Sequence, residues 1–221
     1  MIVSNHIRDR VCSEMANEGL WQQLLELDGQ KTAQRAKCRY LPNPERYIIT
    51  LLNSEYIVNL PEKKVLFAER SAVRHPCRDS DAEFAEELCI LTYLINSQDL
   101  PVANKLSAAE ALPEGQFFFR GPHKLSTEKL EEVFGQCPER LYEVTDKFGA
   151  KRREFGDASI ELYVLPRVPL TIVIWQGDEE FGARASILFD ETAAAQLPLD
   201  ALLAAVNLAI KALVKAAAKS G

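Results

Sequence analysis

The sequence predicts an α+β fold: a mostly antiparallel sheet of about six to seven strands with helices packed on it, a helical N-terminal segment and a long C-terminal helix. Short β-type runs come in two clusters instead of alternating one by one with helices, which is typical of this class. Around the clusters, apolar residues recur at helical spacing. The 221 residues are within the length of one domain. We therefore expect a single domain over residues 1–221, with a helical segment at 1–40 and an α+β body at 41–221.

The first half is predicted to pass from helix to antiparallel meander to helix. A helical stretch over residues 5–36 is broken at Asp28-Gly29, and Pro42 and Pro44 then mark a loop. Three strands separated by turn residues are expected at Tyr47–Leu51, Tyr56–Leu60 and Lys64–Phe67. A helix capped by residues 79–81 follows and runs to Ile95. Its buried stripe is predicted to consist of Phe84, Leu88, Leu91 and Ile95.

The second half is predicted to open with a strand at Gln116–Arg120, which carries three consecutive phenylalanines. Two helices follow, one at Thr127–Phe134 and one that Pro138 opens and Gly149 ends. Lys151–Arg153 is expected to be a short basic loop. Three further strands are expected at Ser159–Leu165, Leu170–Trp175 and Ala185–Phe189. The last element is a long helix from a cap at Asp200 to about Lys219, with Leu202, Val206 and Leu213 facing inward.

Charge and cysteine content exclude several classes of protein. Lys and Arg number 26 against 32 Asp and Glu, a net charge of −6, which argues against a nucleic-acid binder. No apolar stretch approaches the roughly 20 residues that span a bilayer, and His6, Arg8 and Arg10 stand where a signal peptide needs its apolar core. The five cysteines contain no C-x-x-C pair, so the sequence has no cysteine-cluster motif, and the identity of any cofactor stays open. We expect reduced thiols in the cytoplasm.

The first group of candidate site residues lies before a predicted helix. Arg120, His123 and Lys124 directly precede Ser126, the expected N-cap. Free amides and the positive end of a helix dipole bind carboxylates and phosphates. His123 is alternatively a general base or an axial metal ligand. The simpler alternative is that Gly121-Pro122 only turns the chain.

The second group follows a strand-ending tryptophan, Trp175. Asp178, Glu179 and Glu180 are adjacent at a predicted hairpin end, and in an extended segment Asp178 and Glu180 point to one face. Three neighbouring carboxylates either stay in water or are neutralised by a cation. A solvated acidic turn is the simpler alternative.

Two kinds of cation could neutralise the carboxylates of this hairpin, a metal ion or the guanidinium of Arg120. Asp178 and Glu180, with Asp157 or Asp190, would form a weak alternative site for a hard metal ion, which takes six or more oxygen ligands. Arg120 needs only one carboxylate and binds it with two parallel hydrogen bonds. We therefore expect Arg120 to pair with Asp178 or Glu180, and no metal there.

The sequence resembles the domain of unknown function 3786 family of bacteria and archaea. The resemblance rests on Phe118–His123, Phe155–Ser159, Leu165–Leu170, Trp175, Gly177–Phe181 and Leu188–Asp190. It implies that both candidate groups belong to one domain and converge. Some relatives carry an added four-cysteine iron–sulfur module that this chain lacks, and the family is frequent in anaerobes with corrinoid or metal-dependent one-carbon chemistry. The family name supplies no activity.

Three functions follow from these residues, and whether the chain is an enzyme stays open. The first is a cytoplasmic ligand-binding or accessory domain in which Arg120, His123 and Lys124 hold an acidic group, and Trp175 and the consecutive phenylalanines form an apolar wall. The resemblance suggests a carboxylate-bearing ligand of tetrapyrrole or corrinoid type. The second is a metal-assisted hydrolase that uses Asp157, Asp178 and Glu180, with His123 as the base. The third is a protein-interaction module. The partner is a small molecule or protein, with a homodimer as one arrangement.

Overall fold

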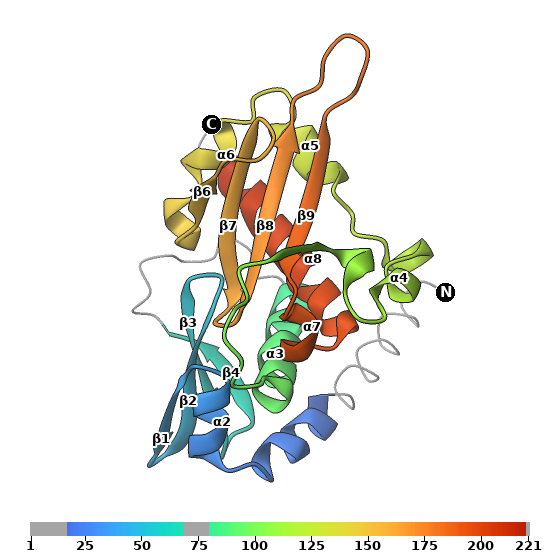
Figure 1. Cartoon of the computed structure of the whole chain (residues 1–221). Coiled ribbons are helices and arrows are strands. Elements are labelled where there is room, and N and C mark those ends of the chain that lie inside the picture. The colour runs from blue at the N-terminus through green and yellow to red at the C-terminus, as the bar shows by residue number, and fades with distance from the viewer. Residues whose placement is uncertain (1–16, 69–79, 220–221) are drawn as a thin grey trace, which may run out of the picture.

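The computed structural model describes residues 17–68 and 80–219 of the chain (Figure 1). It confirms the α+β class, with nine strands in the described part that form two antiparallel sheets instead of one. Residues 17–25 are helical. The longer elements that follow are α2 (Gly29–Arg35), β1 (Arg39–Pro42), β2 (Glu45–Leu51), β3 (Ser54–Asn59), β4 (Lys64–Phe67), α3 (Ser80–Asn96), β5 (Leu106–Ala108), α4 (Gly115–Phe118), α5 (Glu128–Phe134), α6 (Arg140–Glu143), β6 (Lys151–Arg153), β7 (Ala158–Leu165), β8 (Val168–Trp175), β9 (Arg184–Asp190), α7 (Ala193–Gln196) and α8 (Leu199–Ala217).

The four-stranded sheet has the order β1-β2-β3-β4 and contains the predicted meander as β2, β3 and β4. Its first strand, β1, was not predicted, and its last residue, Pro42, was expected to lie in a loop with Pro44. Pro42 stands at the last position of an edge strand, where no N–H group is needed for the ladder. Leu52 and Asn53 form the turn between β2 and β3, both with positive φ. Such a two-residue turn matches the twist of the flanking strands.

The five-stranded sheet has the order β5-β9-β8-β7-β6. Its three central strands are the predicted ones, each slightly longer than expected. The prediction of a loop at Lys151–Arg153 is wrong, because these residues pair with β7 as edge strand β6. β5 was not predicted at all, and its three residues pair with β9 on the opposite edge. Both missed strands are short and become strands by pairing with a longer neighbour.

The strand predicted at Gln116–Arg120 is also wrong, because the chain there forms the single helical turn α4. A helical turn sends three successive side chains in different directions, whereas a strand would alternate them. Phe119 is accordingly buried against Phe189, with ring centroids 6.1 Å apart. Phe117 is 74% exposed. The run of phenylalanines thus contributes one residue to the core and leaves another in solvent.

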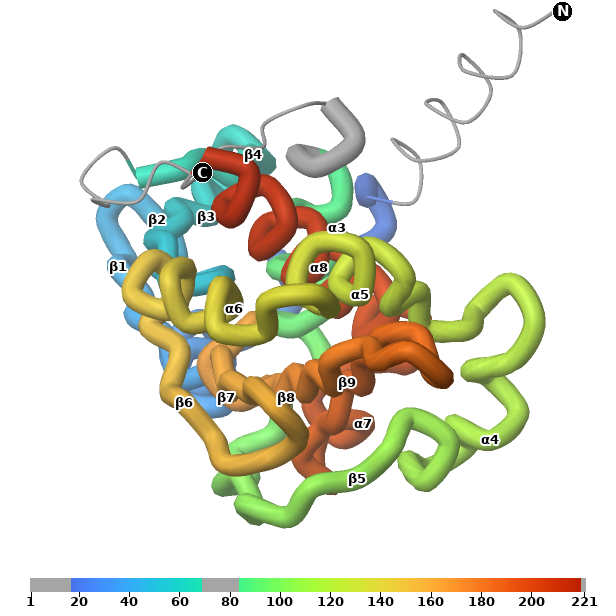
Figure 2. The backbone as a smooth tube through the Cα atoms, turned by 90° about the horizontal axis from the view of Figure 1, so that it is seen from above, coloured from blue at the N-terminus to red at the C-terminus, as the bar shows by residue number. Residues whose placement is uncertain are grey.

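Helices α3 and α8 pack against each other at the centre of the molecule, and α8 passes behind the five-stranded sheet (Figure 1). Seen from above, α5, α6 and α8 cover the same side of this sheet (Figure 2). The predicted inward residues of α8 are all fully buried, namely Leu202, Val206 and Leu213. On α3, Leu91 is buried, but Leu88 and Ile95 are only half-buried, and the deepest residues are Cys89, Ile90, Tyr93 and Leu94. A helix packed on several sides buries more than one stripe.

No helix within residues 17–68 and 80–219 is long and apolar enough to cross a membrane.

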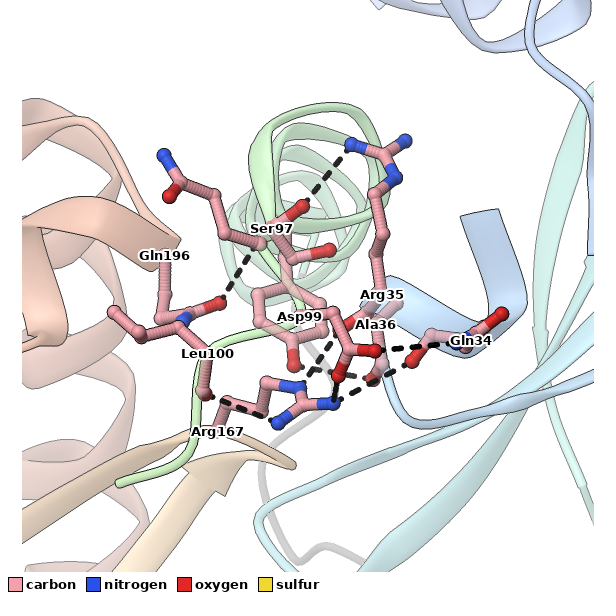
Figure 3. Close-up of polar contacts among 10 residues, drawn as sticks. Gln34, Arg35, Ala36, Ser97, Asp99, Leu100, Arg167 and Gln196 are labelled. Atoms are coloured by element: carbon pink, nitrogen blue, oxygen red, sulfur yellow. Dashed lines mark hydrogen bonds and ion pairs between the residues drawn. The ribbon is translucent and has the colours of Figure 1, made fainter. Parts of the chain in front are cut away.

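Arg167 joins the two halves of the chain (Figure 3). It lies in the β7–β8 turn, and its guanidinium donates to the carbonyl oxygens of Arg35 at 2.8 Å and Leu100 at 3.0 Å. It also donates to the Gln34 carbonyl at 3.5 Å and pairs with Asp99. The last carbonyl groups of a helix have no partner within it. Arg167 therefore supplies donors to the C-terminal end of α2 from a turn 132 positions later in the chain.

Arg35 supplies hydrogen-bond donors to the C-terminal end of α3, as Arg167 does to the end of α2. Its guanidinium donates to the carbonyl oxygens of Ser97 at 3.0 Å and Ile95 at 3.3 Å, at the end of α3. The Tyr93 hydroxyl donates back to the carbonyl of Ala36 at 3.1 Å. A positive charge at a helix C-terminus also interacts favourably with the helix dipole. The ends of α2 and α3 and the β7–β8 turn are thereby tied together.

We expect Arg167→Lys to lower the free energy of unfolding by about 2–4 kcal/mol, because hydrogen bonds from a charged donor contribute roughly 1.5–3 kcal/mol each and a lysine cannot reproduce the planar fork. Urea denaturation measures the change. The control is Arg39→Lys, since Arg39 pairs with Glu55 while both side chains are well exposed, and it should cost less than about 0.5 kcal/mol. Equal effects of the two substitutions would contradict the junction.

Candidate functional site

The two groups of predicted site residues lie at separate places in the fold. The first group flanks the 3-10 turn η2 (Gly121–His123): Arg120, His123 and Lys124. The second group lies at the end of β8 and in the loop after it: Trp175, Asp178 and Glu180. Figure 1 shows this loop projecting beyond one end of the five-stranded sheet, whereas α4 and the chain after it lie beside the start of α8. In the described structure no ion pair joins Arg120 to Asp178 or Glu180, so the expected pair is not formed.

The chain's own carboxylates occupy the helix start that was expected to bind an anion. The N-cap of α5 is Thr127, one residue later than predicted. The Ser126 hydroxyl donates to Glu128 at 2.5 Å and thereby lowers the pKa of that carboxyl. The Thr127 hydroxyl donates to Glu131 at 2.8 Å. An incoming anion would meet these two carboxylates, so this short helix offers no prepared anion site.

Asp178 shapes the loop between β8 and β9. Its carboxylate accepts hydrogen bonds from the N–H groups of Phe181 at 2.7 Å and Glu180 at 2.8 Å, and these bonds lower its pKa. The closed turn leaves the ring of Phe181 71% exposed. At the base of the loop, the guanidinium of Arg184 lies 4.7 Å from the ring centroid of Trp175. Within this loop the carboxylate of Asp178 thus acts on the backbone, and Trp175 already has a cation over its ring.

The fold also uses the other two aspartates that were proposed as metal ligands. Asp157 accepts a hydrogen bond of 2.7 Å from the N–H group of Gln176. Asp190 is buried and accepts four hydrogen bonds, from the N–H groups of Ala103, Lys105 and Thr192 and from the Thr192 hydroxyl. Burial by itself raises the pKa of Asp190, but the bonds from Thr192 and the two other amides outweigh it, and the pKa is lowered. The described residues contain no group of three or more His, Cys, Asp or Glu side chains placed to hold a metal ion.

His123 lies in a surface groove of about 790 Å³. One side of the groove comes from α4 and η2, and the other from α7 and the first residues of α8. The described residues that give it its chemical character are Glu114, Phe117, Phe118, His123, Leu199 and Asp200. Arg120 and Lys124 are exposed nearby in the sequence but do not line it. Of the polar residues predicted for the site, the groove therefore contains His123 alone, and of the predicted apolar wall it contains Phe117 and Phe118 but not Trp175.

The wall of the groove is flat because His123 stacks on Phe118. The two ring centroids are 4.6 Å apart and the ring planes differ by 8°. Gly121 turns the chain back between them with a φ of 55°, a conformation that glycine adopts at no steric cost. Phe117, next to the stacked pair, keeps most of its ring in solvent. Three rings are thus gathered at one side of the groove.

The start of α4 is held close to the preceding 3-10 turn. A Cβ atom at Gly115 would lie 2.0 Å from the carbonyl oxygen of Ala109, so only glycine fits there. Glu114, just before it, is the N-cap of α4 and has a φ of 61°. Phe119, just after α4, is anchored in the core. With both ends of this turn fixed, Glu114 and Phe117 are presented at the groove.

Residues 28–212 match a family described as a domain of unknown function (DUF3786). The chain belongs to this family. The match runs from the N-cap of α2 into α8 and includes both sheets, the Arg167 junction and the groove. No curated protein and no solved structure matches the chain.

The residues on which the DUF3786 resemblance rests mostly stabilise the fold. Arg167 joins the two halves, Asp157 and Asp190 bind backbone amides, and Phe119 packs on Phe189. A second pair from the same set, Phe118 and His123, lines the groove. The family sequence pattern thus marks the framework first and the groove second.

The cysteines described by the structure are free: Cys38 is half-buried, Cys89 buried and Cys137 exposed. Burial raises the pKa of Cys38 and of Cys89 to about 12. Cys137 precedes α6, and its thiol lies 3.6 Å from the Glu139 carboxylate. Cys12, Cys77, His6 and His75 lie outside the described residues.

Sequence reasoning missed Glu114 as a groove residue, assigned Phe117 to a strand instead of a helical turn, and missed Asp200 as a groove residue. A local signal was present for the first two, because Pro113 and Gly115 bracket Glu114 and are typical of a turn that begins a new element. It favours a helical turn over a strand for the phenylalanines. Asp200 was predicted as the cap of α8, but the N-cap is Pro198, and Asp200 accepts a hydrogen bond from the N–H group of Ala201 at 2.8 Å.

We expect Asp190→Asn to destabilise the protein by about 2 kcal/mol at pH 7, because it weakens several charge-assisted hydrogen bonds. The pKa of Asp190 in the folded state lies below its usual 3.8, so the carboxylate contributes fully above pH 3.8 and less as the pH falls through the lower, folded value. The stability difference between wild type and variant should therefore shrink below pH 3.8. Asp146→Asn, at an exposed aspartate, is the control. A difference independent of pH would contradict this assignment.

Adding millimolar Mg²⁺, Mn²⁺ or Ca²⁺ should leave the melting temperature within about 1 °C, since ion binding to the folded state alone would raise it. The reason is that Asp157, Asp178 and Asp190 already accept backbone hydrogen bonds. Differential scanning calorimetry measures this. A rise of several degrees with one metal, lost in Asp178→Asn, would instead favour the metal-assisted hydrolase.

Proposed function

We propose that the chain is a cytoplasmic binding domain and that the groove between α4, η2 and the start of α8 is its ligand site. The observation that carries the proposal is the 74% exposed ring of Phe117 beside the stacked pair of His123 and Phe118. A large apolar side chain gains free energy when a ligand removes its surface from water, by about 25 cal/mol per Å². Aromatic residues placed in this way are typical anchors of binding sites.

The size and lining of the groove support a small organic ligand. Its volume of about 790 Å³ falls within the range of roughly 300–1,000 Å³ of small-molecule sites. The rings and Leu199 provide apolar surface, and the carboxylates and His123 provide polar groups. This distribution of a few polar groups in an apolar wall orients a ligand while burying it.

The lining bears on the ligand classes suggested by the sequence. A flat molecule of tetrapyrrole or corrinoid type finds a flat stacked wall and the imidazole of His123, a residue type that serves as an axial ligand. A ligand bound mainly through its carboxylates would need cationic side chains, and the described lining contains neither lysine nor arginine. The location in the cytoplasm is supported by the three free cysteines of the described residues.

We expect Phe117→Ala to weaken binding of the neutral dye Nile red about five- to thirtyfold, corresponding to about 1–2 kcal/mol of lost apolar contact. Fluorescence titration measures the affinity. Phe181→Ala is a matched control, because Phe181 is 71% exposed at the far end of the sheet, and it should leave binding unchanged. Both rings lie on the surface, so both variants should keep the melting temperature of the wild type.

The opposite result, with Phe181→Ala weakening the dye and Phe117→Ala not, would contradict the groove as the site. Native mass spectrometry and a visible spectrum of protein purified from its own host then identify what the groove carries. A bound small molecule in the mass spectrum, together with absorption in the visible spectrum, supports a tetrapyrrole or corrinoid. A bound protein chain, with no small molecule, would favour the interaction module.

A further inference from the structure

We propose that the ligand of the groove is an organic cation, an ammonium or guanidinium group on an apolar body. This inference rests on the proposed function, since it assigns a chemical class to the ligand of the same groove. It depends on the charges of the lining, on the exposed side chain of Phe117 and on the hydrogen bond at the α8 N-terminus.

The charged groups of the described lining are negative on both sides. Glu114 stands on the α4 side and Asp200 on the α8 side. The side chain of Glu114 makes no hydrogen bond or ion pair with a described residue. One oxygen of Asp200 accepts from Ala201, which leaves the second oxygen for a donor on a ligand. A cation placed between them gains from both carboxylates.

The ring of Phe117 offers the same ligand a second favourable contact. An ammonium or guanidinium within about 6 Å of a ring centroid is attracted by the electron-rich face. The protein uses this contact elsewhere, with Arg184 at 4.7 Å from the Trp175 centroid and Arg152 at 4.3 Å from the Tyr142 centroid. Phe117 has an exposed ring and no such partner among the described residues. The apolar part of the ligand then lies along Phe118 and Leu199.

An anion would be disfavoured in the same place. The N-terminus of α8 points positive dipole charge at the groove, but the carboxylate of Asp200 already accepts the N–H group of Ala201 there. Arg120 and Lys124, which the sequence suggested for an acidic ligand, are not part of the lining. An acidic ligand would therefore face Glu114 and Asp200 without a lysine or arginine of the described lining to offset them.

Three probes that share a phenyl ring and a short chain test the charge preference: 2-phenylethylamine, 2-phenylethanol and 3-phenylpropionate, which are positive, neutral and negative. Titrations followed by ¹H–¹⁵N NMR give the affinities. We expect the amine to bind about five- to tenfold more tightly than the alcohol, in line with a cation–π contact and exposed ion pairs, and the acid to bind most weakly. The double variant Glu114→Gln, Asp200→Asn should bring the amine close to the alcohol while leaving the alcohol unchanged. Glu110→Gln, at an exposed glutamate outside the lining, is the control.

The outcomes separate the two proposals. If none of the three probes shifts the groove resonances of a folded protein, the groove is not the site and the proposed function fails. If the alcohol or the acid binds as tightly as the amine, the groove is the site but the cation inference is wrong. If the amine retains its advantage in a double variant whose melting temperature is unchanged, the carboxylates are not its partners and the inference is also wrong.

Discussion

The carbonyl groups at the ends of α2 and α3 must find donors outside their own helices, and two arginines supply them. Arg167 reaches α2 from the β7–β8 turn, and Arg35 reaches α3 from α2. The two sheets are further tied where the Leu52 N–H group donates to the carbonyl of Val164 at 2.9 Å. Because the donors and acceptors come from distant parts of the chain, neither half can satisfy its backbone alone. The groove depends on this framework, since its α8 side is packed on α3.

The sequence was sufficient to predict the fold class because its long helices and strands have clear patterns of apolar residues. β3 alternates buried and half-buried residues, and the inward residues of α8 recur at helical spacing. The strands that were missed, β1, β5 and β6, have only three or four residues each, and β1 and β6 also contain proline or charges. Their state is imposed by pairing with a neighbour and not by local preference. The phenylalanines before Arg120 look like a buried strand in the sequence, but the turn at Glu114-Gly115 makes them helical.

The candidate site was predictable only in part. His123 and the phenylalanines before it were singled out, whereas Glu114 and the groove residues within 194–200 were not, because no local pattern connects them to His123. The expected pairing of Arg120 with Asp178 or Glu180 is not formed, and Asp178 accepts hydrogen bonds within its own loop, as short acidic side chains commonly do. Burial and local hydrogen bonds thus determine the roles of the acidic residues. Neither can be predicted from the spacing of these residues in the sequence.

The edges of the five-stranded sheet determine how another protein can approach it. A long, flat edge strand offers a row of backbone groups to which a foreign strand can be added. Here one edge is the three residues of β5 and the other is Lys151–Arg153, three consecutive positive charges. An added peptide strand would form few hydrogen bonds with β5 at one edge and would meet three positive charges of β6 at the other edge. Assembly by strand exchange or fibril growth is thereby discouraged at this sheet, and a protein partner must recognise side chains.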